Sequence, residues 1–257
     1  MLSDVALDRE LRFSCYFCHM SHRHSMAIAL DGARYQVAYL DWGTGPVLLC
    51  LHGFGGSKAN WLAVMKRLAS QYRCVSVDLL GFGETCLFGS PESCLPVAIP
   101  SIAREAAFVR AVARTLGLEP CAIAGHSFGG WVAATYALRY PKAVTACILV
   151  APVGLQGDGF GDRPRPLWPS LHGGSAHDDF RDFARWEAEK LDAVVGDMRI
   201  PTLVIAAEND TDVPLSCPQA YAATIPNARL QVIPRAGHAL PLEHAADIAA
   251  AISAFLA

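Results

Sequence analysis

The chain has 257 residues, of which 53% are hydrophobic and 18% are charged, and its net charge is -3. This composition is typical of a compact globular protein and argues against a disordered chain. The charge balance offers no basic surface for nucleic acid, and no apolar run reaches the roughly 18 residues of an integral membrane segment.

The N-terminal residues and the cysteines bear on the compartment. Charged side chains interrupt residues 1–10, so the apolar centre of a secretory signal is missing. The nine cysteines are odd in number and fall mostly in apolar, strand-like runs, where a free thiol behaves as a small hydrophobe. A reducing environment suits this usage better than a disulfide framework does. We therefore expect a cytoplasmic protein.

The predicted elements begin with an antiparallel hairpin at residues 25–30 and 33–41, around Asp31-Gly32. Short apolar runs then alternate with longer helical stretches. The predicted strands are residues 47–51, 74–77, 121–124, 146–150, 203–206 and 230–233. The predicted helices are residues 61–71, 102–117, 128–140, 217–224 and 242–256. Runs without polar alternation suit strands buried on both faces. The sequence thus predicts an α/β fold, with a mostly parallel eight-stranded sheet between two layers of helices.

One segment interrupts this alternation. Residues 152–174 are rich in Gly and Pro, and a charged helix is expected over 178–195, with Phe180, Phe183, Trp186, Leu191 and Val194 available to pack. A long insertion inside a compact domain is usually functional, although a surface excursion without a role is the alternative. We expect an N-terminal extension at 1–24, a core at 25–151 and 200–257, and a lid at 152–199.

The stretch Gly125-His126-Ser127-Phe128-Gly129 fits G-x-S-x-G between an apolar strand and an alanine-rich helix. In that context the serine occupies a tight turn, and flanking glycines let the strand and the helix approach each other. The helix N-terminus beneath the serine supplies partial positive charge where an oxyanion forms. Ser127 is therefore the candidate nucleophile.

A serine hydroxyl needs a base to remove its proton. His238 follows the last apolar run, and Asp210 follows the run at 203–206. The chain order Ser…Asp…His is the one expected when the nucleophile lies on a strand–turn–helix. All three residues lie beyond the carboxyl ends of parallel strands, where open α/β sheets place their sites.

The chain resembles the α/β-hydrolase superfamily over about residues 26–257, and especially its serine carboxylesterase and monoacylglycerol-lipase-like members with a short cap. The matching motifs are HGFGG (52–56), DLLGFGET (78–85), GHSFGG (125–130), ENDTDVP (208–214) and GHALPLE (237–243). The resemblance implies that Asp210, three residues before the Val-Pro pair, is the acid. Asp212 and then Glu208 are the rivals, and a solvated turn or helix cap is the competing role for Asp212.

The same resemblance implies an oxyanion hole built from the backbone N–H groups of Phe54 and Phe128. It leaves His52 and His126 as residues that hydrogen-bond the loops rather than transfer protons. Because the elbow carries a serine and not an aspartate, dehalogenase and epoxide-hydrolase chemistry are disfavoured.

The expected reaction is hydrolysis of a small-molecule ester with a short to medium acyl chain, without cofactor or metal. The expected substrate-binding residues are Trp61, Trp131, Phe160 and Trp168, of which Trp61 and Trp131 also suit the core. Three alternatives remain: a carbon–carbon bond hydrolase, a cofactor-free perhydrolase or acyltransferase, and a small-molecule receptor that retains the triad. The oligomeric state is left open.

Residues 15–24, CYFCHMSHRH, contain a C-x-x-C-H pattern that also occurs in haem attachment and, with its histidines, suggests zinc. Haem attachment normally requires export, and a structural zinc needs four ligands on a folded scaffold. We expect an extra N-terminal strand or a loose arm instead.

Overall fold

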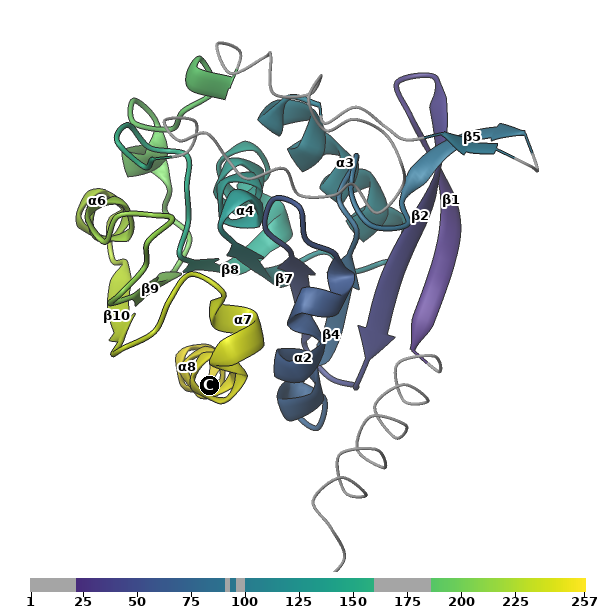
Figure 1. Cartoon of the computed structure of the whole chain (residues 1–257). Coiled ribbons are helices and arrows are strands. Elements are labelled where there is room, and N and C mark those ends of the chain that lie inside the picture. The colour runs from purple at the N-terminus through teal and green to yellow at the C-terminus, as the bar shows by residue number, and fades with distance from the viewer. Residues whose placement is uncertain (1–21, 91–92, 96–99, 160–185) are drawn as a thin grey trace, which may run out of the picture.

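The computed structural model describes residues 22–90, 93–95, 100–159 and 186–257. Within them the chain forms one sheet of ten strands in the order β10-β9-β8-β7-β3-β4-β2-β5-β6, with β1 paired to β2 (Figure 1). The strands are β1 (Arg23–Leu30), β2 (Ala33–Trp42), β3 (Val47–Leu51), β4 (Arg73–Val77), β5 (Cys86–Ser90), β6 (Ser93–Leu95), β7 (Cys121–His126), β8 (Val144–Val150), β9 (Thr202–Ala207) and β10 (Arg229–Ile233).

The six strands from β10 to β4 are parallel, and β1 and β2 form an antiparallel hairpin, as the sequence predicts. Strand β2 also pairs antiparallel with β4, which joins the hairpin to the parallel strands. The structure adds a second antiparallel hairpin, β5–β6, beyond β2. The expected number of eight strands was therefore two too few. The segment CLFGSPESCL is short and interrupted by Gly, Ser and Pro, so it lacks the long apolar run by which the other strands were found.

Helices cover both faces of the sheet (Figure 1). The helices are η1 (Lys58–Trp61), α2 (Leu62–Leu68), α3 (Ile102–Thr115), α4 (Phe128–Arg139), η2 (Pro141–Ala143), η4 (Val195–Asp197), α6 (Ser216–Thr224), α7 (Leu240–Glu243) and α8 (Ala245–Leu256). Alternate residues of β3 enter opposite cores: Leu49 and Leu51 pack on the side of α3, α4 and α6, and Leu48 and Cys50 on the side of α2 and α8. This two-sided burial is why the central strands lack polar alternation.

Two predicted helices differ in detail. The stretch at 242–256 breaks at His244, where φ is -122° and ψ is 36°, into the short α7 and the longer α8. The helix expected over 178–195 is described only from Trp186, and helical structure has ended by residue 188. There the Leu191 N–H bonds the Gly154 carbonyl at 2.9 Å, which directs the chain back onto the loop after β8.

The two described ends of the 152–199 insertion lie side by side. Besides the Leu191–Gly154 bond, the backbone N–H of Gln156 donates to the Asp192 carboxylate at 3.0 Å. The Lys190 ammonium lies 3.4 Å from the carboxylate of Asp158, which is fully buried. Phe160 and Trp168 lie outside the described residues, so their predicted role in substrate binding stays a prediction.

The described cysteines include free thiols and a disulfide-bonded one. Five are free and buried: Cys50, Cys74, Cys121, Cys147 and Cys217. Burial raises the pKa of Cys147 to about 12, so its thiol stays neutral and packs as an apolar group. Cys86 in β5 is disulfide-bonded, a bond that the expectation of a reducing environment did not anticipate. The disulfide was missed together with the β5–β6 hairpin.

No helix within the described ranges is long and apolar enough to cross a bilayer. Within the same ranges, no three His, Cys, Asp or Glu side chains are grouped so that they could hold a metal ion. The C-x-x-C-H residues themselves lie outside the described part. Two histidines near the end of the 15–24 stretch are described: the His22 ring stacks on Trp42 and the His24 ring on Tyr39, with ring centroids 4.5 and 5.3 Å apart.

Candidate active site

Ser127 lies on a strained turn between β7 and α4. Its φ of 53° and ψ of -117° are unusual for a residue with a side chain, and such conformations cost about 1–3 kcal/mol. The Ser127 N–H is held by the Val150 carbonyl of β8 at 2.9 Å. The side chain is thereby fixed at the carboxyl end of the sheet, where the residue is 6% exposed.

The glycines around Ser127 are required by close backbone approach. A Cβ at Gly125 would overlap the Gly129 carbonyl, and a Cβ at Gly129 would overlap the carbonyls of Leu51 and His52. The first turn of α4 therefore rests directly on the end of β3. This contact explains why glycines flank the serine on both sides.

The structure brings together the three residues predicted to form the triad. His238 Nε2 lies 3.0 Å from Ser127 Oγ, and His238 Nδ1 lies 2.8 Å from Asp210 Oδ2. They come from the segments after β7, β9 and β10, at one edge of the sheet. With Nδ1–H donating to the carboxylate, Nε2 is free to accept the serine proton.

The local hydrogen bonds single out Asp210 among the three acidic candidates. Its Oδ1 accepts from the backbone N–H groups of Asp212 and Val213, both at 2.8 Å. Burial opposes ionisation of Asp210, but the bonds from His238, Val213 and Asp212 outweigh it and lower its pKa. Asp212 is exposed and contributes its backbone N–H, while the Glu208 carboxylate accepts from Arg235 N at 2.8 Å.

His126 contacts the loop of His238. Its Nε2 donates to the main-chain carbonyl of His238 at 2.8 Å, and the two rings lie 4.9 Å apart. Burial, and then the nearby His238, lower the pKa of His126 to about 3, so the ring is neutral near pH 7. This contact agrees with the predicted role of His126 in holding a loop.

The loop predicted to donate to an oxyanion also lies beside Ser127. A Cβ on Gly53 would come within 3.2 Å of Ser127 Cβ and 3.0 Å of His126 Nδ1. Phe54 follows Gly53, and Phe128 is the first residue of α4. The Phe54 and Phe128 rings meet edge to face at 5.9 Å. Both predicted oxyanion residues are thus neighbours of the serine.

Two further aromatic side chains join Phe54 and Phe128. Phe82 packs on Phe54 at 5.2 Å and on Phe128 at 5.9 Å, and Trp186 packs on the same two rings at 6.2 and 6.1 Å. Trp186 is only 4% exposed. Sequence reasoning assigned neither to the site. Phe82 between two glycines of DLLGFGET was a usable signal, whereas nothing separates Trp186 from the other apolar residues of its segment.

The structure places Trp61 and Trp131 in the core, against their prediction as substrate-binding residues. Both are fully buried. Trp61 packs on the α2–α8 side of the sheet and donates from its indole to the Leu51 carbonyl at 2.9 Å. Trp131 packs on the opposite side under Gly154, where a Cβ would lie 2.5 Å from the indole ring. Both side chains therefore pack as core residues.

Among curated relatives, the chain is 31% identical over 245 residues to the pimeloyl-[acyl-carrier protein] methyl ester esterase of Aeromonas hydrophila subsp. hydrophila, covering 79% of this chain and 92% of that protein. It is 38% identical over 133 residues to the dihydrolipoyllysine-residue acetyltransferase component of the acetoin cleaving system of Cupriavidus necator. That match covers 52% of this chain and 32% of that protein, and the chain spans about a third of several other relatives.

Solved structures share the fold. An esterase from Thermogutta terrifontis superposes with a TM-score of 0.75 at 23% identity, covering 91% of this chain and 97% of that one. A meta-cleavage product hydrolase from Pseudomonas fluorescens gives 0.73 at 23% identity, with 90% and 97% covered. The alpha/beta hydrolase fold family matches residues 46–174 and 162–245. The chain therefore belongs to the alpha/beta hydrolase family.

Proposed function

We propose that this protein is a serine hydrolase that cleaves carboxylic esters of short to medium acyl chains through an acyl-enzyme on Ser127. The observation that carries the proposal is the position of one imidazole. His238 Nε2 lies 3.0 Å from Ser127 Oγ, while Nδ1 is held by Asp210 at 2.8 Å. This arrangement lets a base take the serine proton with its tautomer already fixed.

In the first half of the reaction, Ser127 Oγ attacks the ester carbonyl carbon and its proton passes to His238 Nε2. Asp210, kept ionised by its hydrogen bonds, stabilises the imidazolium. The backbone N–H groups of Phe54 and Phe128 stabilise the negative carbonyl oxygen of the tetrahedral intermediate. The carbon–oxygen bond to the alcohol then breaks, and the alcohol oxygen takes the proton from His238.

In the second half, water attacks the carbonyl carbon of the acyl-enzyme and gives a proton to His238. Collapse of this intermediate breaks the bond to Ser127 Oγ, which regains the proton. The products are a carboxylic acid and the free serine. His238 returns each proton that it takes, so the cycle needs no redox step and no external proton carrier.

The side chains beside Ser127 support a neutral, apolar acyl group. Phe54, Phe82, Phe128 and Trp186 form a cluster of edge-to-face and tilted ring contacts that carries no charge. Such surfaces favour hydrocarbon over anionic groups. The similarity to the Aeromonas relative, which is named as a methyl ester esterase, also supports an ester as the substrate of this protein.

The test is hydrolysis of p-nitrophenyl acetate, butyrate, octanoate and laurate by the wild type and by Ser127→Ala. We expect turnover of the shorter soluble esters, and a loss of about 10⁴-fold or more in kcat for the variant. Wild-type turnover by Ser127→Ala would contradict the proposal. So would activity confined to emulsified long-chain esters.

The same assay separates the alternatives. Preference for dienone-type ketones over all esters would indicate a carbon–carbon bond hydrolase. Faster product formation with added alcohol or peroxide would indicate an acyltransferase or perhydrolase, since these acceptors replace water at the acyl-enzyme. A single stoichiometric turnover followed by tight retention of the ligand would indicate a receptor.

A further inference from the structure

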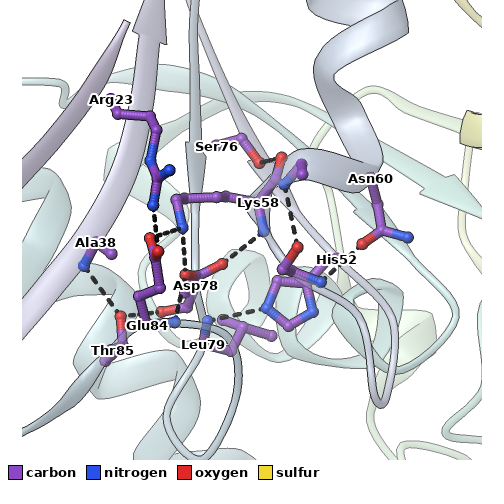
Figure 2. A network of polar contacts seen from close by, with 12 residues as sticks. Arg23, Ala38, His52, Lys58, Asn60, Ser76, Asp78, Leu79, Glu84 and Thr85 are labelled. Carbon is purple, nitrogen blue, oxygen red and sulfur yellow. Dashed lines mark hydrogen bonds and ion pairs between the residues drawn. The ribbon is translucent and has the colours of Figure 1, made fainter. Parts of the chain in front are cut away.

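A buried ion pair joins Lys58, which lies four residues after Phe54 in the chain, to Asp78, which follows β4 (Figure 2). The Lys58 ammonium contacts Asp78 Oδ2 at 2.7 Å and Glu84 Oε2 at 2.6 Å, and the Asp78 side chain is fully buried. Asp78 also accepts from the backbone N–H groups of Lys58 at 2.6 Å and Glu84 at 2.8 Å. Arg23 pairs with Glu84 at the outer end of this network. Asp78 therefore holds both the backbone and the side chain of Lys58.

The residue after Asp78 holds the other end of the same loop. The Leu79 N–H donates to His52 Nε2 at 3.0 Å, so the ring carries its proton on Nδ1. His52 Nδ1 then donates to the Gly53 carbonyl at 2.7 Å. Asp78 and Leu79, the two residues that follow β4, thus fix the end of the 52–58 loop through Lys58 and its start through His52 (Figure 2).

The Gly53 carbonyl and the Phe54 N–H belong to one planar peptide unit, in which they point in opposite directions. The carbonyl is held by His52 Nδ1 at 2.7 Å and by Gly56 N at 3.0 Å. Any bond that fixes this carbonyl consequently fixes the direction of the Phe54 N–H. Gly53 lies against Ser127, so the Phe54 N–H belongs to a peptide unit that starts beside the nucleophile.

We propose that Lys58 and Asp78 are positioning residues that hold the 52–58 loop so that the Phe54 N–H faces the oxyanion. The proposal rests on the ester-hydrolase function proposed above. Neither side chain touches substrate. Their effect passes through the loop backbone, from the Lys58–Asp78 contacts at one end and the His52–Gly53 bond at the other.

The energetics of buried ion pairs favour a positioning role over a purely stabilising one. Removing two charges from water is costly, and apolar replacements of buried pairs are often as stable as the originals. A pair that contributes little net stability still defines one backbone arrangement, because three donors converge on the Asp78 carboxylate. A glycine is needed beside it, since a Cβ at Gly83 would overlap the carboxylate.

The test compares Lys58→Met, which keeps the aliphatic stem and removes the ammonium, with the wild type. Oxygen esters and matched thionoesters serve as substrates, because sulfur accepts hydrogen bonds more weakly than oxygen does. A displaced N–H lowers kcat on the oxygen ester by about 10- to 100-fold with KM little changed. The ester-to-thionoester rate ratio falls by a similar factor. Asp78→Asn is the second variant and gives the same pattern.

Two controls identify the cause. Glu84→Gln alters the outer, half-exposed member of the network and should leave the rate ratio at the wild-type value. His238→Gln removes the base, so it slows both substrates without changing the ratio.

A wild-type ratio in folded, Ser127-dependent Lys58→Met would overturn the positioning role and leave the ester-hydrolase proposal standing. Wild-type turnover by Ser127→Ala would instead remove the hydrolase proposal itself. If neither Lys58→Met nor Asp78→Asn gives a folded protein by circular dichroism, the pair serves stability and the positioning proposal is wrong.

Discussion

The imidazole of His126 donates a hydrogen bond to the main-chain carbonyl of His238 at 2.8 Å. A residue next to the nucleophile in sequence is therefore bonded to the backbone of the proposed base, more than a hundred residues away. The contact needs a neutral His126 with its proton on Nε2. Burial enforces this state by lowering the pKa of the ring to about 3.

The burial of His126 predicts a specific sensitivity of the fold to acid. Between about pH 6.5 and 3, the unfolded chain binds a proton at residue 126 that the folded protein does not, so the free energy of unfolding falls as pH is lowered. His126→Gln keeps an N–H donor but cannot titrate. It should reduce the pH slope by up to about 1.4 kcal/mol per unit. Urea denaturation at several pH values in this window measures the slope, and equal slopes for both proteins would contradict the account.

If Asp210 and not Asp212 is the acid of the triad, an Asp→Asn substitution should have very different effects on kcat at the two positions. Asp210→Asn removes the carboxylate that fixes the His238 tautomer, so kcat should fall by about 10⁴-fold with the fold intact. Asp212→Asn leaves the backbone N–H that donates to Asp210 and should keep kcat near the wild-type value. Steady-state kinetics on a soluble ester decide between them. A larger loss from Asp212→Asn would reverse the assignment.

Much of the framework could be predicted because its signals are local. The apolar runs of β3 and β7 are buried on both faces, and the elbow glycines are required by contacts within one strand–turn–helix. Trp186 could not be assigned to the site, because its position depends on contacts with Phe54 and Phe128 from distant segments. Trp61 was predicted as a pocket wall with the core as its competing position, and the structure buries it in the core, because a large aromatic residue near a motif suits both places.

The effect of replacing a glycine by alanine should depend strongly on whether the glycine lies in the turn around Ser127 or in the loop before His238. A Cβ at Gly125 would overlap backbone atoms of Gly129, whereas nothing lies within 4 Å of a Cβ at Gly237. Gly125→Ala should therefore lower the free energy of unfolding by about 1–3 kcal/mol or more and abolish turnover. Gly237→Ala should change stability little. Thermal unfolding and ester hydrolysis measure both effects, and a stable, active Gly125→Ala would show that the turn is less crowded than described.

The position of Trp186 predicts that removing its side chain changes the preference for acyl-chain length. Trp186→Ala removes a ring that packs on Phe54 and Phe128, leaving space beside the proposed acyl site at a cost of about 3–5 kcal/mol in stability. The kcat/KM ratio of octanoate to acetate ester should rise. Trp61→Ala, made in the core on the other side of the sheet, should destabilise without moving the ratio. An equal shift in both variants would remove Trp186 from the acyl site.

The central claim is that His238 activates Ser127 as a nucleophile. A fluorophosphonate ester reacts covalently with an activated serine, and peptide mass spectrometry locates the adduct. We expect one label per chain, on Ser127, in the wild type, and little labelling in His238→Gln, which lacks the base. Labelling of another residue, or equal labelling of Ser127 with and without His238, would contradict the account.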